Sequence, residues 1–366
     1  MDYQLKIVIS GGGTGGHIFP AIAIADALKR RNPDTEILFI GAKGRMEMER
    51  VPKAGYPIEG LWISGLQLDK SIVSLPFKLI SSLYNAHKIL KRFKPDVVIG
   101  VGGFASGPTL KAANWLHIPT VIQEQNSYPG KTNRNVGSKA RAICVAYEAM
   151  DQWFPKDRIH LTGNPLRANI KAEGTREEAA DFFGMDSKKP VALLIGGSQG
   201  ALGINKGISA QLEVLKQKDI QLVWQTGKSY FNQAQDEVNR LGMEDQVKPT
   251  VFIERMDLAY SLADIVISRA GAMSISELAL VQKPVIFVPL PTAAQDHQTK
   301  NAQRLVDASA ALLVRNDETE TQLIPSLIAL AADTKKQATM RENIGAFAHP
   351  NAADDIVDII LDIAKK

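Results

Sequence analysis

The sequence contains a single cysteine, Cys144, among 366 residues. One thiol excludes a disulfide framework and any multi-cysteine metal site, and it is typical of a reducing compartment. No apolar run approaches the roughly 18 residues that a membrane-spanning helix needs. The first ten residues lack the basic start and long apolar stretch of a signal peptide. These absences predict a cytoplasmic protein with no membrane-spanning segment.

Net charge is also small, because 43 Lys and Arg residues are opposed by 39 Asp and Glu residues. The resulting charge of +4 gives no reason to expect a nucleic-acid partner. The distribution is uneven, however. Between Lys70 and Arg141 there are eleven basic residues and only two acidic ones, Asp96 and Glu124. This excess predicts a basic face on one half of the molecule.

Short apolar runs with strand character alternate with helical stretches along most of the chain. The first half has such runs at 5–10, 37–41, 97–101, 120–123 and 143–146. The second half has them at 191–195, 222–224, 248–253, 265–268, 285–288 and 311–314. Alternating strands and helices predict parallel sheets built from β-α-β units.

Both halves open in the same way, with an apolar strand, a glycine loop and a helix. We therefore predict an α/β protein with two doubly wound, Rossmann-like domains. The N-terminal domain would span 1–167 and the C-terminal domain 168–349, with the boundary near 164–171. The tail, at about 350–366, has the spacing of an amphipathic helix and would pack back on the N-terminal domain.

The first glycine loop has the sequence GGGTGGH at residues 11–17. A loop between a strand and a helix N-terminus directs N–H groups and a positive dipole at an anion. It is a poor dinucleotide fingerprint, because Gly41 and Ala42 end the second strand where a ribose-binding acid would stand. No Gly-Lys-Ser/Thr follows, so it is not a P-loop. A tight turn that only permits helix–sheet packing is the alternative.

His17 lies where this loop meets the helix. Imidazole titrates near neutral pH, and the positive end of a helix favours its neutral, proton-accepting form. His17 is therefore a candidate general base. The alternative is a histidine at a helix start that only bonds a local carbonyl group.

The second glycine loop, GGSQGA at residues 196–201, repeats the arrangement and predicts a diphosphate cradle with the Ser198 hydroxyl as an extra donor. A turn without a ligand is the alternative. The sequence contains no D-x-D, no H-E-x-x-H and no cysteine cluster. We therefore expect no protein-bound metal cofactor, and expect helix dipoles, backbone N–H groups and Arg167 to meet the diphosphate charge.

Three further polar segments follow predicted strands, at the edge of the sheet where α/β proteins bind ligands. The segment 271–277 places Glu277 in what we expect to be a first helical turn, where it would bond ribose hydroxyls or, alternatively, form a capping box with Ser274. The segments around Gln298 and Asn126 suit a sugar with many hydroxyl groups. Ordinary polar loops are the alternative for both.

The segment 72–80, IVSLPFKLI, is unusually apolar for so basic a region, and Trp115 and Leu116 lie further along the same domain. An exposed apolar patch with a basic rim would dock on anionic lipid headgroups. Core packing of one helix is the alternative, because the sequence does not show which side faces outward.

Seven motifs in series resemble the MurG family of peptidoglycan N-acetylglucosaminyltransferases, which are GT-B glycosyltransferases. They are GGGTGGHIFPAIAIA at the start, GGFASGP at 102–108, EQNSYPGKTN at 124–133, TGNPLR at 162–167, GGSQGA at 196–201, RAGAMSISEL at 269–278 and PLPTAAQDHQTKNA at 289–302. The resemblance covers nearly the whole chain. One modest departure is that Ala270 and Ser274 stand where the family pattern has Ser and Thr.

The resemblance implies two domains facing across a cleft and a UDP-N-acetylglucosamine donor held mainly by the C-terminal one. It implies that Thr14, Gly15 and Gly16 approach the donor and that Asn126 lies near the sugar. It further implies that Arg167 and Ser198 lie near the uridine and diphosphate, and that the Ile253 backbone contacts uracil. Gln298 would bind the N-acetylglucosamine, and Glu277 would bind the ribose. The segment that would hold the nucleotide consists of Ala272, Met273, Ser274, Ile275, Ser276 and Glu277. His17 is the implied base.

The implied reaction is an inverting transfer to the C4 hydroxyl of lipid I, giving lipid II. The resemblance also implies a peripheral enzyme on the cytoplasmic face of the inner membrane, in contact with anionic lipid and with other peptidoglycan-synthesis enzymes. Three alternatives stay open: a UDP-sugar epimerase of the same fold, a nicotinamide oxidoreductase and a nucleotide-sugar sensor without turnover.

Overall fold

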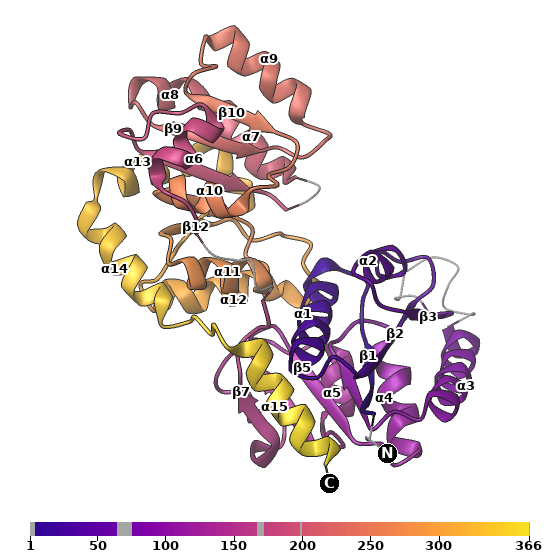
Figure 1. Ribbon diagram of the computed structural model, residues 1–366. Coiled ribbons are helices and arrows are strands. Elements are labelled where there is room, and N and C mark those ends of the chain that lie inside the picture. The colour runs from indigo at the N-terminus through magenta and orange to yellow at the C-terminus, as the bar shows by residue number, and fades with distance from the viewer. Residues whose placement is uncertain (1–3, 64–74, 167–171, 198–199, 366) are drawn as a thin grey trace. The chain divides into compact units, whose positions relative to one another are not determined.

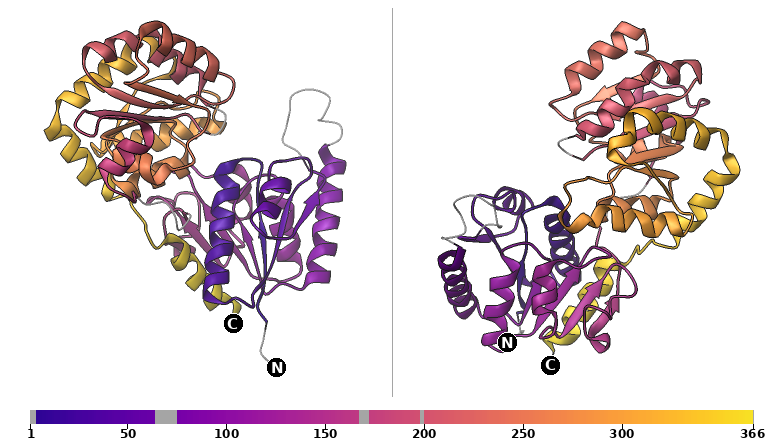
Figure 2. Two further views of the ribbon diagram at one scale, coloured as in Figure 1. Left: turned by 45° about the horizontal axis from the view of Figure 1, so that its top comes forward. Right: turned by 180° about the vertical axis from the view of Figure 1, so that it is seen from behind.

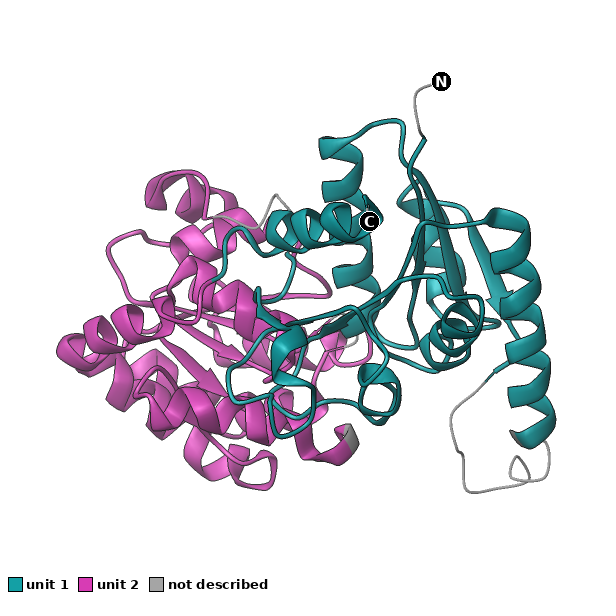
Figure 3. Ribbon diagram, turned by 90° about the horizontal axis from the view of Figure 1, so that it is seen from below, with its two compact units in different colours: residues 1–167, 349–366 teal, residues 168–348 magenta. Residues whose placement is uncertain are grey.

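The computed structural model describes residues 4–63, 75–166, 172–197 and 200–365 (Figure 1). The chain divides into two compact units (Figure 3). Unit 1 contains residues 1–167 together with 349–366, and unit 2 contains residues 168–348. Each unit is an α/β body with one parallel sheet, so the predicted fold class is confirmed.

The sheet of unit 1 has seven parallel strands in the order β3-β2-β1-β4-β5-β6-β7. The order reverses between β1 and β4, which are hydrogen-bonded neighbours and form the switch point of the sheet. The strands are β1 (Lys6–Ser10), β2 (Glu36–Ala42), β3 (Ile58–Leu61), β4 (Val97–Gly100), β5 (Thr120–Glu124), β6 (Ala142–Val145) and β7 (Ile159–Leu161).

Helices cover both faces of this sheet (Figure 2). One buried cluster joins α1 and α15 to the strands, and a second joins α3, α4 and α5 to the other face. The helices of unit 1 are α1 (Gly15–Arg31), α2 (Glu47–Lys53), α3 (Leu75–Phe93), α4 (Ser106–Trp115), α5 (Lys131–Gly137) and α15 (Ala352–Ala364), with a 3₁₀ turn η1 (Lys156–Arg158).

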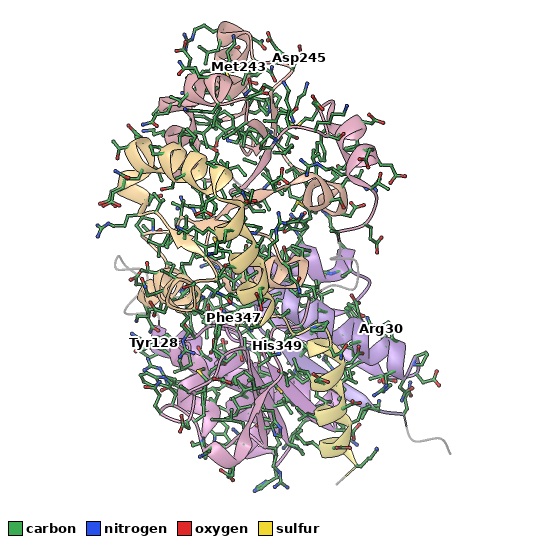
Figure 4. All side chains as sticks on the ribbon, turned by 90° about the vertical axis from the view of Figure 1, so that its left-hand side faces the viewer. Arg30, Tyr128, Met243, Asp245, Phe347 and His349 are labelled. Atoms are coloured by element: carbon green, nitrogen blue, oxygen red, sulfur yellow. The ribbon has the colours of Figure 1, made fainter. Side chains whose placement is uncertain are left out.

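The C-terminal helix α15 lies beside α1 within unit 1 (Figures 1 and 4). Its apolar face, which includes Ile356 and Ile360, is fully buried in the same cluster as α1. Arg30 on α1 pairs with Asp354 at 3.4 Å. His349 opens the returning segment and packs closely on the turn after β7, since a Cβ on Gly163 would lie 2.2 Å from the His349 Cβ.

Unit 2 has six parallel strands in the order β10-β9-β8-β11-β12-β13. They are β8 (Val191–Ile195), β9 (Gln221–Gln225), β10 (Val247–Thr250), β11 (Ile265–Ser268), β12 (Val285–Phe287) and β13 (Leu312–Leu313). The helices are α6 (Arg176–Phe183), α7 (Leu202–Ala210), α8 (Leu212–Gln217), α9 (Phe231–Leu241), α10 (Met256–Leu262), α11 (Ala272–Val281), α12 (His297–Asp307), α13 (Thr319–Ala332) and α14 (Thr334–Gly345), with 3₁₀ turns η2 (Ala294–Asp296) and η3 (Asn316–Glu318).

Two predicted features of the fold need correction. The pattern of apolar runs misses β3 and β7, which are short strands at the two edges of their sheet and carry Glu59 and His160. The strand predicted at 248–253 ends at Thr250. Among the described residues, no helix combines the length and the apolarity that crossing a membrane requires.

Candidate functional site

The first glycine loop connects β1 to α1 in a conformation that requires glycine. Gly12 and Gly13 have φ angles of 142° and 88°. The loop also lies directly against the segment after β4, because a Cβ on Gly103 would come within 2.3 Å of the Gly12 carbonyl oxygen. Two loops from neighbouring strands thus meet at the carboxyl edge of the sheet, at its switch point.

Glu47, the first residue of α2, occupies the inner side of this loop. Its side chain is 1% exposed. One carboxylate oxygen accepts a hydrogen bond from Gly13 N at 2.9 Å, and the other accepts one from Ala42 N at 3.0 Å. The expectation that this loop aims its N–H groups at a bound anion therefore needs correction at Gly13, whose partner is a carboxylate of the chain itself. Glu47 was not among the residues predicted from the sequence.

His17 lies in the first turn of α1, three residues after the N-cap residue Thr14. Its Nδ1 atom is 3.1 Å from the Gly12 carbonyl oxygen and 3.2 Å from the Thr14 hydroxyl oxygen. The local-carbonyl alternative is thus present, and it leaves the other ring nitrogen as the candidate base atom. Gly15 and Gly16 begin the helix, so their N–H groups lack an intrahelical acceptor.

Asn126 follows β5 and is held by the buried carboxylate of Glu124. Glu124 Oε1 accepts from Asn126 N at 3.0 Å and from Asn126 Nδ2 at 3.2 Å. Glu124 Oε2 accepts from Gly130 N at 3.0 Å and from Asn133 Nδ2 at 2.9 Å.

The segment after β4 lies between His17 and the segment after β5. A Cβ on Gly102 would lie 2.9 Å from His17 Nε2 and 3.7 Å from Asn133 Nδ2. The segments after β1, β4 and β5 therefore converge in unit 1.

The second glycine loop, in unit 2, opens on a cavity of about 720 Å³. Gly200 has a φ angle of 77°, and a Cβ there would lie 2.0 Å from the Thr226 carbonyl oxygen. The cavity is lined by Gly196, Gly197, Gly200, Ala201, Leu202, Gly203, Lys206, Arg269, Gly271, Ser274, Leu290, Pro291, Gln298, Asn316, Asp317, Thr319 and Glu320. Ser274 and Gln298 are thus brought together, whereas Ser198 and Arg167 lie outside the described residues.

Arg269, which follows β11, supplies a partly buried cation to this cavity. Its Nη1 atom donates to the carbonyl oxygens of Val288 and Pro289 at 3.0 and 3.1 Å and to Asn316 Oδ1 at 2.9 Å. Burial lowers the pKa of Arg269 to about 10, which leaves the guanidinium protonated at neutral pH. Lys206 lines the same cavity, which therefore has two cations among its lining residues. Neither Arg269 nor Lys206 was among the residues predicted from the sequence.

Helix α11 begins at Ala272 with Gly271 as its N-cap. The N–H groups of Ala272, Met273 and Ser274 consequently lack intrahelical acceptors. This start excludes the alternative of a capping box with Ser274 as the N-cap, because Ser274 is inside the helix. Glu277 correspondingly lies in the second turn, not in the first as expected.

The side chains of α11 divide between the core and the polar surroundings of the helix. Ile275 is buried in the core, and Ser276 Oγ donates to the Ala272 carbonyl oxygen at 3.1 Å. Glu277 accepts a hydrogen bond from the Tyr260 hydroxyl at 3.4 Å. Burial, followed by the negative charge of Glu277, raises the pKa of Tyr260 well above its usual value.

Two other predicted residues are fixed by hydrogen bonds within unit 2. Ile253 N donates to Gln225 Oε1 at 3.0 Å, while Gln225 Nε2 donates to the Gly197 carbonyl oxygen at 3.0 Å. The Gln225 amide therefore ties Ile253 to the second glycine loop, and the Ile253 N–H is already used within the fold. Gln298 Oε1 accepts from Leu290 N at 2.9 Å. The described residues contain no group of three or more His, Cys, Asp or Glu side chains placed to hold a metal ion.

Comparison with protein families matches both units. Residues 7–145 match the N-terminal domain of glycosyltransferase family 28, and residues 191–356 match its C-terminal domain. The chain belongs to glycosyltransferase family 28. This assignment accounts for the paired glycine loops, one in each family domain.

Individual family-28 relatives are similar over almost their whole length. The UDP-N-acetylglucosamine--N-acetylmuramyl-(pentapeptide) pyrophosphoryl-undecaprenol N-acetylglucosamine transferase of Flavobacterium psychrophilum is 50% identical over 365 residues, covering 99% of this chain and 98% of that protein. The transferase of the same name from Bacteroides fragilis is 48% identical over 367 residues, covering 99% and 96%.

Solved structures agree with the family assignment. The crystal structure of Acinetobacter baumannii MurG matches with a TM-score of 0.81 and 28% identity, covering 98% of this chain and 99% of that one. The resemblance to the MurG family, predicted from seven motifs, is confirmed. A UDP-GlcNAc 2-epimerase from Neisseria meningitidis, bound to UDP-GlcNAc, has a TM-score of 0.66 at 17% identity, covering 98% of this chain and 100% of that one, so it shares only the fold with this family-28 chain.

Proposed function

We propose that this chain transfers N-acetylglucosamine from UDP-N-acetylglucosamine to the C4 hydroxyl of the N-acetylmuramoyl sugar of lipid I, giving lipid II for peptidoglycan synthesis. The observation that carries the proposal is the identity of about 50%, over nearly the full length, to transferases named for this reaction. It is supported by two glycine loops of different chemical character, one beside a histidine and one beside the cations Arg269 and Lys206.

We assign the nucleotide to the cavity of unit 2. Arg269, Lys206 and the N-terminal N–H groups of α7 and α11 form an environment suited to a diphosphate. In this assignment Glu277 bonds the ribose, the Ile253 carbonyl meets uracil and Gln298 meets the sugar, while Arg167 and Ser198 contribute from outside the described residues. Thr14, Gly15, Gly16 and Asn126 of unit 1 contact the donor sugar.

The reaction assigned to these groups is an inverting displacement. The acceptor C4 hydroxyl attacks the anomeric carbon opposite UDP, His17 Nε2 takes its proton, and the bond to UDP breaks. The transition state has oxocarbenium character, as in glycoside hydrolysis. The departing diphosphate is stabilised by Arg269 and by the dipoles of α7 and α11. An α-linked donor then gives a β-1,4 linkage.

We further propose that catalysis needs no protein-bound metal. Two cations that line the cavity beside Asp317 and Glu320 support this, since Arg269 and Lys206 offer the positive charge that a metal ion gives a leaving diphosphate elsewhere. Transfer should therefore persist in excess EDTA. Loss of activity in EDTA that added Mg²⁺ restores would contradict this part of the proposal.

We also propose that unit 1 docks on an anionic membrane surface, at the cytoplasmic face of the inner membrane. Helix α3 and its surroundings carry exposed large apolar side chains within the basic region 70–141. The most exposed are Phe77 at 68%, Tyr84 at 68%, Ile80 at 66% and Trp115 at 58%. Lys78 Nζ lies 5.7 Å from the centre of the Trp62 ring. Apolar side chains with a basic rim suit anionic headgroups, and a protein held there is placed to meet other peptidoglycan-synthesis enzymes.

The direct test measures UDP release from UDP-N-acetylglucosamine with and without a lipid I analogue. We expect release that depends on the acceptor, together with a disaccharide-linked lipid product. Conversion of the donor alone into an epimer would replace the transferase with the epimerase alternative. Binding of the donor without turnover in either condition would indicate a sensor.

A further inference from the structure

One peptide unit in the first glycine loop is hydrogen-bonded on both sides to ionisable groups. Its carbonyl oxygen, that of Gly12, lies 3.1 Å from His17 Nδ1. Its N–H group, that of Gly13, donates to Glu47 Oε2 at 2.9 Å. A carboxylate and the candidate base are therefore joined through a single amide plane.

The tautomer of His17 follows from this contact. A carbonyl oxygen only accepts hydrogen bonds, so the bond to Gly12 requires a proton on Nδ1. The Thr14 hydroxyl, 3.2 Å from Nδ1, then acts as a second acceptor. The lone pair of the neutral ring is consequently on Nε2, the atom assigned above to receive the acceptor proton.

Glu47 is an unusual residue to bury at this position. Both carboxylate oxygens accept backbone N–H groups, and within the described residues no Lys, Arg or His nitrogen lies within 4.0 Å of them. Burying a carboxylate without a cation is costly, although bonds to N–H groups offset part of the cost. The carboxylate accepts the N–H groups of Gly13 and Ala42, which an apolar side chain of the same shape would leave without this acceptor. Hydrogen bonds to two separate backbone segments, and not packing alone, therefore fix this carboxylate against the loop.

Two glycines make room for this side chain. A Cβ on Gly12 would lie 2.3 Å from Glu47 Cδ, and a Cβ on Gly41 would lie 2.6 Å from Glu47 Cγ. The absence of side chains at both positions lets the carboxylate come against the loop. The space is therefore shaped for Glu47 from two separate segments, the end of β2 and the β1–α1 loop.

We propose that Glu47 is a positioning residue for His17 and acts through the Gly12–Gly13 peptide unit. The carboxylate polarises the amide, which strengthens its carbonyl oxygen as an acceptor. The stronger acceptor holds the Nδ1–H tautomer, aims Nε2 and stabilises the imidazolium that forms when Nε2 takes a proton. This role deepens the proposed function, on which its kinetic test rests.

The test is a double-mutant cycle of Glu47→Gln and His17→Ala, read by acceptor-dependent UDP release. Glutamine keeps the shape but accepts only one of the two N–H groups and carries no charge. We expect Glu47→Gln to lower kcat by about tenfold, less than loss of the base itself, with an unchanged Kd for UDP. In the His17→Ala background the same change should lower kcat no further. An equal loss in both backgrounds, or no loss in either, would overturn the proposal.

A second readout needs no substrate. ¹⁵N-labelled histidine spectra, assigned with His17→Ala and recorded at a pH where imidazole is neutral, should show His17 as the Nδ1–H tautomer. Glu47→Gln should move it toward a mixture, and an unchanged tautomer would count against the relay. If Glu47→Gln does not fold, Glu47→Asp, which keeps the charge but shortens the reach to Gly13, should give the same two changes. Wild-type protein without acceptor-dependent turnover would instead contradict the proposed function, while the spectra would still test the relay.

Discussion

The two glycine loops begin alike in sequence and differ in what they face. The loop of unit 1 carries a protein carboxylate on one side, where Glu47 accepts the Gly13 N–H. The loop of unit 2 opens on a cavity that contains Arg269 and Lys206. A strand–glycine–helix motif therefore has no fixed chemistry of its own. The charged side chains that other segments place beside the motif determine whether it suits an anion or positions a side chain.

This difference gives the two units separate tasks in the proposed reaction. Unit 2 has the cations and helix N-termini that suit a diphosphate, whereas unit 1 has the imidazole that suits a proton transfer. A substitution in one loop should accordingly leave the function of the other loop unchanged. Such a selective effect is measurable, because binding of UDP and transfer to the acceptor are separate assays.

The largest expected effect is loss of the base in unit 1. His17→Ala should lower acceptor-dependent transfer by about 10²- to 10⁴-fold, the usual range for removal of a general base. The Kd for UDP should stay within about twofold of wild type, because no atom of His17 lines the cavity of unit 2. Single-turnover transfer and calorimetry with UDP would measure the two quantities. Transfer that survives the substitution would move the base to another residue.

A smaller effect is expected from distorting the loop of unit 2. Gly200→Ala places a Cβ 2.0 Å from the Thr226 carbonyl oxygen and also requires a positive φ angle of an alanine. We expect UDP binding to weaken by about tenfold or more, or roughly 1.4 kcal/mol. Gly13→Ala in unit 1 is the matched control, since it shares the positive φ angle but its Cβ would meet no atom within 4 Å. Equal weakening by both variants would show that UDP binding depends on both loops.

The sequence predicts the two loops well because their signal is local. An apolar strand, clustered glycines and a helical run are contiguous at both 5–31 and 191–210, and the structure has β1–α1 and β8–α7 there. The sequence also identifies His17 and Gln298 as candidates, because each follows a strand at a helix start. These features need no knowledge of what else approaches the loop.

The residues that distinguish the two loops could not be predicted from the local sequence, because they come from distant positions in the chain. Glu47 reaches Gly13 across 34 positions, and Arg269 is held by carbonyl groups that β12 brings alongside β11. Local patterns also give a wrong prediction where two residues could each be the N-cap of the same helix. Ser274 and Glu277 match a capping box, yet Gly271 takes the N-cap with an extended backbone at ψ 144°, so the helix starts too early for Ser274.

The apolar surface offers a further contrast between the units, with an effect of several-fold. Phe77→Ser combined with Leu79→Ser in unit 1 should weaken binding to vesicles of mixed neutral and anionic lipid by about threefold to tenfold, since both side chains are exposed. Phe182→Ser on α6 of unit 2 removes a similarly exposed aromatic side chain and should leave vesicle binding unchanged. Sedimentation with vesicles would compare them, with unfolding curves confirming that each variant is folded. Unchanged binding in the unit 1 variant would remove this surface from the proposal.

The last expected effect is on stability alone, and concerns a partly buried cation of unit 2 outside the nucleotide cavity. Burial, with a lesser contribution from Arg341, lowers the pKa of Lys283 to about 8, and Nζ donates to the Ala263 carbonyl oxygen at 2.8 Å. The unfolded chain binds this proton more tightly than the folded one, so stability should rise as the pH increases from about 8 towards the ordinary lysine pKa near 10.4. Lys283→Met removes this dependence. The difference in unfolding free energy between the two proteins should therefore shift in favour of wild type by roughly 2 kcal/mol between about pH 7 and pH 10. Urea unfolding at both pH values measures this shift. A difference that stays constant would mean that folding does not change the pKa of Lys283, and that its burial in unit 2 does not disfavour the charged form.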